Sequence, residues 1–200
     1  MEISKKSIIK NLSLIFFIYA ITQQFSFASG TMDESEIDKV NKVDAASEEE
    51  KNRLSIAAGL LSDYEILAKK LVASLNTDSI NVDTVNQQAN KLLELSETVI
   101  DSAQFRLPQC KEYLKKSLQL KDILHEISNE ELEKDYHHDG ALPKASAECY
   151  HTKDLFVHPA TVVVLTRDDP QLNNKTKSSI NAEITEVLSH LELVRQLIIY

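Results

Sequence analysis

Residues 54–75 read LSIAAGLLSDYEILAKKLVASL, and this stretch decides the fold class. Apolar side chains recur in it at spacings of three and four residues. This spacing gathers them on one face of an α-helix for about six turns. A helix with one apolar face must pack that face against other elements, so we predict an all-α protein built around it. The apolar positions are Leu54, Ala57, Ala58, Leu61, Tyr64, Leu67, Ala68, Leu71, Val72 and Leu75.

The bounds of this first helix are predicted from capping residues. Ser47 followed by Glu50 matches a capping box, in which each side chain binds a backbone N–H at the start of a helix. Residues 76–78 (NTD) are typical of a turn and predict its end.

Three further stretches repeat the amphipathic pattern, at about residues 83–104, 108–127 and 175–197. A second capping box, Ser128 with Glu131, predicts a break and a short helix after the third of the four long helices. Four long amphipathic helices predict an antiparallel four-helix bundle. The segment between the third and the last long helix is predicted to be a long crossover loop.

The crossover contains one ambiguous stretch, residues 155–165 (LFVHPATVVVL). Its three consecutive valines favour a strand, but no second strand is visible to pair with it. Pro159 is tolerated at the first position of a helix, so a short helix is the preferred interpretation. Asp139–Gly140 and Pro143 predict turns before this stretch.

The N-terminus has the pattern of a secretory signal peptide. Three lysines precede a ten-residue apolar run, residues 12–21, and Ser26-Phe27-Ala28 places small residues around a cleavage site after Ala28. The run is too short to cross a bilayer as a helix, so we expect no stable membrane insertion after cleavage, and an uncleaved anchor is the weaker alternative. The protein is therefore predicted to be periplasmic or secreted. Residues 1–28 would be the signal peptide, 29–46 a mobile acidic tail in which a short helix is the alternative, and 47–200 a single helical domain.

Cys110 and Cys149 are the two cysteines of the chain. An even number of cysteines in an oxidising compartment predicts a disulfide bond, which would clamp the crossover loop to the third helix. The alternative is a free Cys149 thiolate, either as a metal ligand or as a nucleophile beside His151. Export favours the disulfide.

The chain is acidic, with a formal net charge of −9. Such a chain is repelled by phosphate backbones, and it gains nothing from an anionic membrane surface. Nucleic acid is therefore excluded as an expected partner.

Four of the six histidines lie between residues 137 and 158, in the predicted crossover loop. Imidazole is the commonest protein ligand for transition metals, and the aspartates of this segment could ligate or orient an imidazole. Zinc or copper are the ions expected for an exported protein. The spacing is less specific than the count, because HExxH and paired CxxC motifs are absent. The candidate metal ligands are His137, His138, Asp139, His151, Asp154 and His158.

Two alternatives to a metal site remain. The histidines of the loop could be purely structural, capping helices and binding backbone groups. Non-covalent haem, which helical bundles can hold between a methionine and a histidine, is a narrower alternative. His190 on the last helix and Met32 in the tail are the residues for it.

No enzyme motif is present: the chain has no GxSxG elbow, no phosphate-binding glycine loop and no dinucleotide fingerprint. The sequence therefore predicts an exported, non-enzymatic helical bundle. Our first hypothesis is that it binds a transition metal or a metal-bearing ligand through the histidine-rich loop. The second is an accessory module that binds another protein of the cell envelope, with the loop purely structural.

Overall fold

The computed structural model describes residues 34–77 and 80–200, and this part of the chain is helical without any strand. The predicted signal peptide and its cleavage site after Ala28 lie outside these residues. The long helices are α1 (Glu34–Leu75), α2 (Val82–Arg106), α6 (Ala147–Asp168) and α7 (Asn174–Ile199). The short ones are η1 (Pro108–Cys110), α3 (Lys111–Leu118), α4 (Leu120–Ile123), α5 (Asn129–Leu132) and η2 (Glu133–His137), which is a π-helix.

The chain divides between Val40 and Asn41 into two units, and the hydrophobic core belongs entirely to the second. Helix α1 begins at Glu34, so the predicted start at Ser47 was wrong. Residues 34–46, where the sequence allowed a short helix within a mobile tail, are part of α1. No helix in the described part of the chain combines the length and the apolar character needed to span a membrane.

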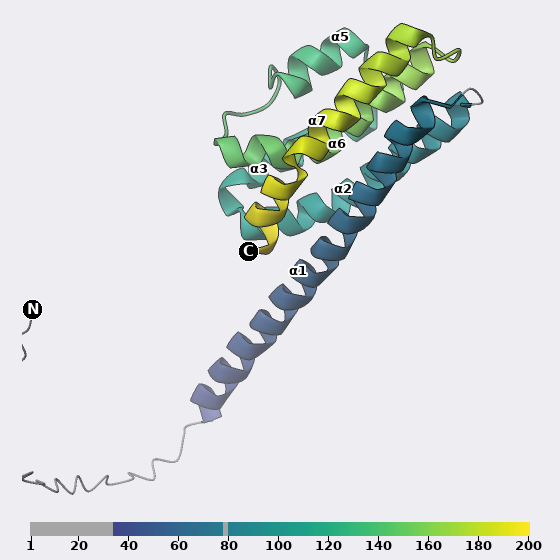
Figure 1. Ribbon diagram of the computed structural model, residues 1–200. Helices are drawn as coiled ribbons and strands as arrows, with labels where there is room; N and C mark the ends of the chain where they lie inside the picture. The colour runs from purple at the N-terminus through teal and green to yellow at the C-terminus, as the bar shows by residue number, and fades with distance from the viewer. Residues whose placement is uncertain (1–33, 78–79) are drawn as a thin grey trace, which may run out of the picture. The chain divides into compact units, whose positions relative to one another are not determined.

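Helix α6 is the central element of the second unit. It packs against α2 and α7 along its length and against α3 and α5, and Figure 1 shows α6 and α7 side by side. Residues 152–162 of α6 are all buried. A helix that is buried on every side shows no alternation between an apolar and a solvent-exposed face, even though Lys153, Asp154 and His158 are among its buried residues. The ambiguous stretch 155–165 is therefore the interior of a long helix, which includes the short helix preferred from the sequence.

The prediction of a long crossover loop was right only for residues 138–146. From Ala147 onward the chain is already α6, so three of the candidate ligands, His151, Asp154 and His158, lie on a buried helix. The third long helix expected over 108–127 is divided into η1, α3 and α4. The all-α fold class is confirmed.

Pro159 lies in the middle of α6, where it has no N–H to donate to the carbonyl of Leu155 one turn earlier. The hydroxyl of Tyr64 on α1 donates to this carbonyl over 3.0 Å. Tyr64 is fully buried, and burial, with a smaller contribution from the charge of Asp154, raises the pKa of its hydroxyl well above the usual value. One side chain of α1 thus supplies the hydrogen bond that the proline removes from α6.

The predicted disulfide between Cys110 and Cys149 is confirmed, with Cα atoms 5.4 Å apart. It joins η1 to the first turn of α6 and lies in the core. The capping box of Ser128 and Glu131 is also confirmed at the start of α5.

Candidate metal centre

The facing sides of α6 and α7 carry matching sets of polar residues. Each set follows the spacing of three and then four residues, which keeps it on one side of its helix. The contacts pair the sets in opposite order, since His151 lies against His190 and His158 lies against Glu183. We call this strip the polar seam. It consists of His151, Asp154 and His158 on α6 with Glu183, Glu186 and His190 on α7.

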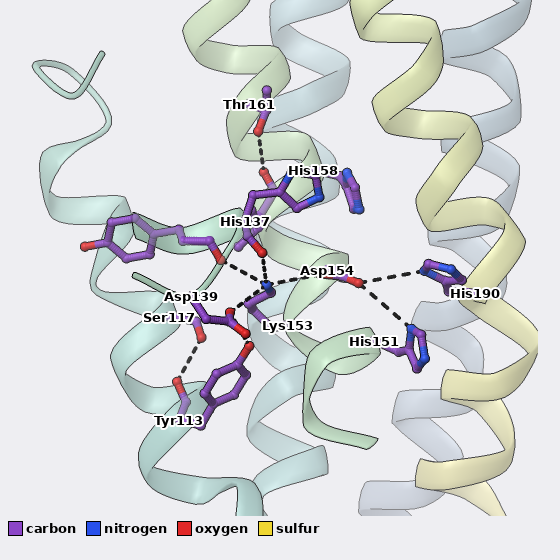
Figure 2. A network of polar contacts seen from close by, with 12 residues as sticks. Tyr113, Ser117, His137, Asp139, His151, Lys153, Asp154, His158, Thr161 and His190 are labelled. Carbon is purple, nitrogen blue, oxygen red and sulfur yellow. Dashed lines mark hydrogen bonds and ion pairs between the residues drawn. The ribbon is translucent and has the colours of Figure 1, made fainter. Parts of the chain in front are cut away.

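The first group of potential ligands in the seam is His151, Asp154 and His190, shown in Figure 2. The Nδ1 atom of His190 lies 3.7 Å from Oδ2 of Asp154, and that of His151 lies 4.0 Å from the same oxygen. Both separations are too long for hydrogen bonds. Both Nδ1 atoms are buried and have no hydrogen-bond partner.

These separations suit ligands that surround a common ion. Two ligands at about 2.1 Å from a tetrahedral zinc ion are about 3.4 Å apart. The ligand atoms of His151, Asp154 and His190 lie within 4.8 Å of one another, so they would have to draw closer together to coordinate one ion. Three protein ligands leave one position open for water or for another molecule.

The second group consists of His137 from η2, His158 from α6 and Glu186 from α7. The ligand atoms of these three residues lie within 4.8 Å of one another. His158 is fully buried, and its Nε2 has no hydrogen-bond partner. The rings of His137 and His158 meet edge to face with centroids 4.8 Å apart.

A carboxylate holds each of these two imidazoles at its other nitrogen. The Nδ1 of His158 lies 2.7 Å from Glu183 Oε2, and that of His137 lies 2.8 Å from Glu133 Oε2. Burial lowers the pKa of His137, but the hydrogen bond and charge of Glu133, with the more distant charges of Glu183 and Asp154, outweigh it and raise the pKa. In metal sites, carboxylates of this kind fix the tautomer and the orientation of ligating histidines.

His138 is exposed and stacks on His137, with ring centroids 5.3 Å apart. It belongs to a third and more open group with Glu133 and His137. In this group, Oε2 of Glu133 already binds Nδ1 of His137.

Asp139, although predicted as a ligand, lies outside all three groups. Its Oδ1 accepts hydrogen bonds from the hydroxyl of Tyr113 over 2.6 Å and from Nζ of Lys153 over 3.0 Å. Its backbone is left-handed, with φ at 61°, in the turn after η2. The next residue, Gly140, has room for no side chain, since a Cβ would meet the carbonyl oxygen of Lys134 at 2.6 Å.

Lys153 is a buried ammonium group beside the seam, with 2 % of its side chain exposed. It donates to the carbonyls of Tyr136 and His137 over 2.9 Å each, as well as to Asp139. Its Nζ also lies 3.5 Å from Oδ1 of Asp154 (Figure 2). Lys153 therefore ties η2 to α6 and leaves Oδ2 of Asp154 for the two imidazoles.

A surface pocket gives solvent access to this region. Its lining includes Asp154 of the first group and His137 and Glu186 of the second. The lining residues are His137, His138, Asp139, Tyr150, Lys153, Asp154 and Glu186.

Sequence reasoning missed Glu183 and Glu186, and it considered His190 only as a haem ligand. The evidence was present in the sequence, because Glu183, Glu186 and His190 repeat the spacing of His151, Asp154 and His158. The other residue of the haem hypothesis, Met32, lies outside the described residues.

No protein-family model, curated protein or solved structure matches this chain.

Proposed function

We propose that this protein is an exported, non-enzymatic metal-binding protein that holds a zinc or copper(II) ion at His151, Asp154 and His190. One observation carries the proposal. Two buried imidazole nitrogens without hydrogen-bond partners converge on a single carboxylate oxygen.

The cost of burying unpaired polar atoms supports this interpretation. A buried nitrogen that loses its hydrogen bond to water costs about 1–3 kcal/mol, and most such atoms in proteins find a partner. Coordination of a cation would give both nitrogens a partner at once. Two imidazoles and a carboxylate suit zinc or copper(II), whereas copper(I) favours sulfur ligands. Both cysteines are in the disulfide and supply no thiolate.

The proposal extends to the compartment and the topology. The signal peptide predicted over residues 1–28 implies export, and the disulfide agrees with an oxidising compartment. We further propose that α1, α2, α6 and α7 form an antiparallel four-helix bundle, with the shorter helices packed beside it. The absence of catalytic motifs supports a binding role, and the acidic charge argues against nucleic acid as a partner.

Titration calorimetry with zinc and with copper(II) tests this function. The chain is expressed through the periplasm without a His-tag and stripped with a chelator. We expect it to take up zinc, and we expect replacement of His190 by glutamine to remove one equivalent. His125→Gln is the matched control, because that side chain is 76 % exposed and lies outside the three groups.

Failure to bind either ion would overturn the metal-binding function. That result would favour the second hypothesis, an accessory module that binds another envelope protein.

A further inference from the structure

We propose that the seam holds a second metal ion, bound by His137, His158 and Glu186, one helical turn from the first. This inference rests on the proposed function, since it assigns a further site to the same seam. The two sites share no ligand. The first uses residues of α6 and α7 only, whereas the second adds a side chain from η2.

His158 provides the strongest evidence for the second site. A carboxylate can only accept hydrogen bonds, so its contact with Glu183 requires the proton of the neutral ring to be on Nδ1. The lone pair is then on Nε2. This atom is buried without a partner, although the residue is completely shielded from water. A structural histidine at this position would be expected to use both nitrogens.

His137 repeats the arrangement from another part of the chain. Its Nδ1 is bound to Glu133, so its Nε2 is the atom left for a ligand. His137 is the last residue of the π-helix η2, and such turns are frequent at functional sites. Two imidazoles from separate elements thus lie edge to face, and each is held by its own carboxylate.

Glu186 completes the group with an exposed carboxylate that lines the surface pocket. Glu133, Glu183 and Glu186 together bring three negative charges to this site. Among the residues that the structure describes, no lysine or arginine forms an ion pair with any of them. A divalent cation would supply the missing positive charge.

The two sites therefore differ in charge. In the first, the ammonium group of Lys153 lies 3.5 Å from Asp154 and offsets part of its negative charge. At the second, Lys153 donates to the backbone carbonyl of His137 but forms no ion pair with Glu133, Glu183 or Glu186, so this site should favour a divalent ion more strongly. The second ion would also bind η2 to α6 and α7, because its ligands come from all three helices.

The stoichiometry of zinc binding tests the inference, measured by calorimetry and by elemental analysis of the dialysed protein. We expect two equivalents for the unmodified chain, one for Glu186→Gln, one for His190→Gln, and none for the variant with both changes. Glu186 is exposed, so its replacement leaves the core intact. Glu192→Gln, on the same helix and also exposed, is the control and should retain both ions.

Two further readouts separate ligation from a merely structural role. Glu183→Gln, which removes a positioning carboxylate, should weaken the second site by about 10–100-fold and leave the first unchanged. Zinc should slow amide hydrogen exchange in residues 133–137 of the unmodified chain. This protection should disappear in Glu186→Gln.

The outcomes distinguish the inference from the function on which it rests. A single equivalent that survives Glu186→Gln and is lost in His190→Gln would overturn the second site and keep the first. Two equivalents retained in both Glu186→Gln and His137→Gln would also overturn the second site. A single equivalent lost with Glu186 but not with His190 would keep the second site and overturn the first. No binding at all would overturn both.

Discussion

Helix α6 carries buried polar groups on two sides, and the two sides differ in whether these groups have hydrogen-bond partners. Toward α1 and η2, each group has a partner: Tyr64 binds the carbonyl freed by Pro159, and the ammonium group of Lys153 has three acceptors. Toward α7, Nδ1 of His151 has no partner, and His158 binds Glu183 through Nδ1 but leaves its buried Nε2 without one. The same helix thus follows the usual rule of pairing on one side and departs from it on the other. Of the four buried side-chain atoms without a hydrogen-bond partner in the described residues, three belong to His151, His158 and His190 in the seam, and the fourth is Oδ1 of Asn129 in α5. Exceptions gathered in one seam point to a ligand there, whereas evenly scattered ones would point to poor packing.

The largest effect is expected where a paired group is removed. Lys153→Met leaves the carbonyls of Tyr136 and His137 without this donor and Asp139 with Tyr113 alone, so it should lower the free energy of unfolding by about 3 kcal/mol. Chemical denaturation measures this loss. Lys144→Met, at an exposed position, is the control and should change stability by less than about 0.5 kcal/mol. Equal stability of the two variants would show that the hydrogen bonds of Lys153 do not stabilise the folded chain.

The next largest effect is the stabilisation expected when zinc binds the unpaired imidazoles of the seam. Zinc at 100 times its dissociation constant should raise the free energy of unfolding by about 2.7 kcal/mol for each ion, since it binds the folded chain. His190→Leu should lose the part of this gain that comes from the first site. The measurement is a denaturation curve with and without zinc. An equal gain in this variant would contradict ligation by His190.

A smaller effect is expected at the contact between α1 and α6. Tyr64→Phe leaves the carbonyl of Leu155 buried and unpaired, at a cost of about 1–3 kcal/mol. In a Pro159→Ala background residue 159 regains an N–H that can bind this carbonyl, so Tyr64→Phe should cost less. A double-mutant cycle by chemical denaturation measures the difference. Strict additivity of the two changes would show that the tyrosine does not compensate for the proline.

The smallest effect is the sharpest test of the comparison. In metal-free protein, His190→Leu removes an imidazole whose buried nitrogen has no partner, so stability should change by less than about 0.5 kcal/mol. Thermal or chemical denaturation in the presence of a chelator measures it. A loss of 2 kcal/mol or more without metal would mean that His190 is structural.

The sequence predicted the amphipathic helices, which have one face toward water and one toward the core. The stretches expected over residues 83–104 and 175–197 lie within two residues of the bounds of α2 and α7. Helix α6 could not be predicted in the same way, because its residues 152–162 are all buried and burial on all sides produces no periodicity. Pro159 and the neighbouring valines added a local preference for extended structure, which the packing overrides.

The candidate site was predicted in part, for a related reason. The excess of histidines identified His137, His151 and His158, but the loop expected around them hid their helical spacing. Once α6 is known to be a helix, the sequence shows that the seam residues of α6 and those of α7 have the same spacing along their helices. The contribution of η2 does not, since it depends on a turn whose geometry has no simple sequence pattern.

The π-helix η2 makes the seam sensitive to insertions and deletions in a way that substitutions do not reveal. Its wider turn corresponds to one residue more than an α-helical path would need, and each residue added to a helix rotates all later ones by about 100°. Deleting one residue between Glu133 and Tyr136 would therefore turn the imidazole of His137 away from His158 while changing neither side chain. Relatives of this protein should preserve the length of this segment even where its composition drifts, and a gap there would mark a lineage that has lost the second ion.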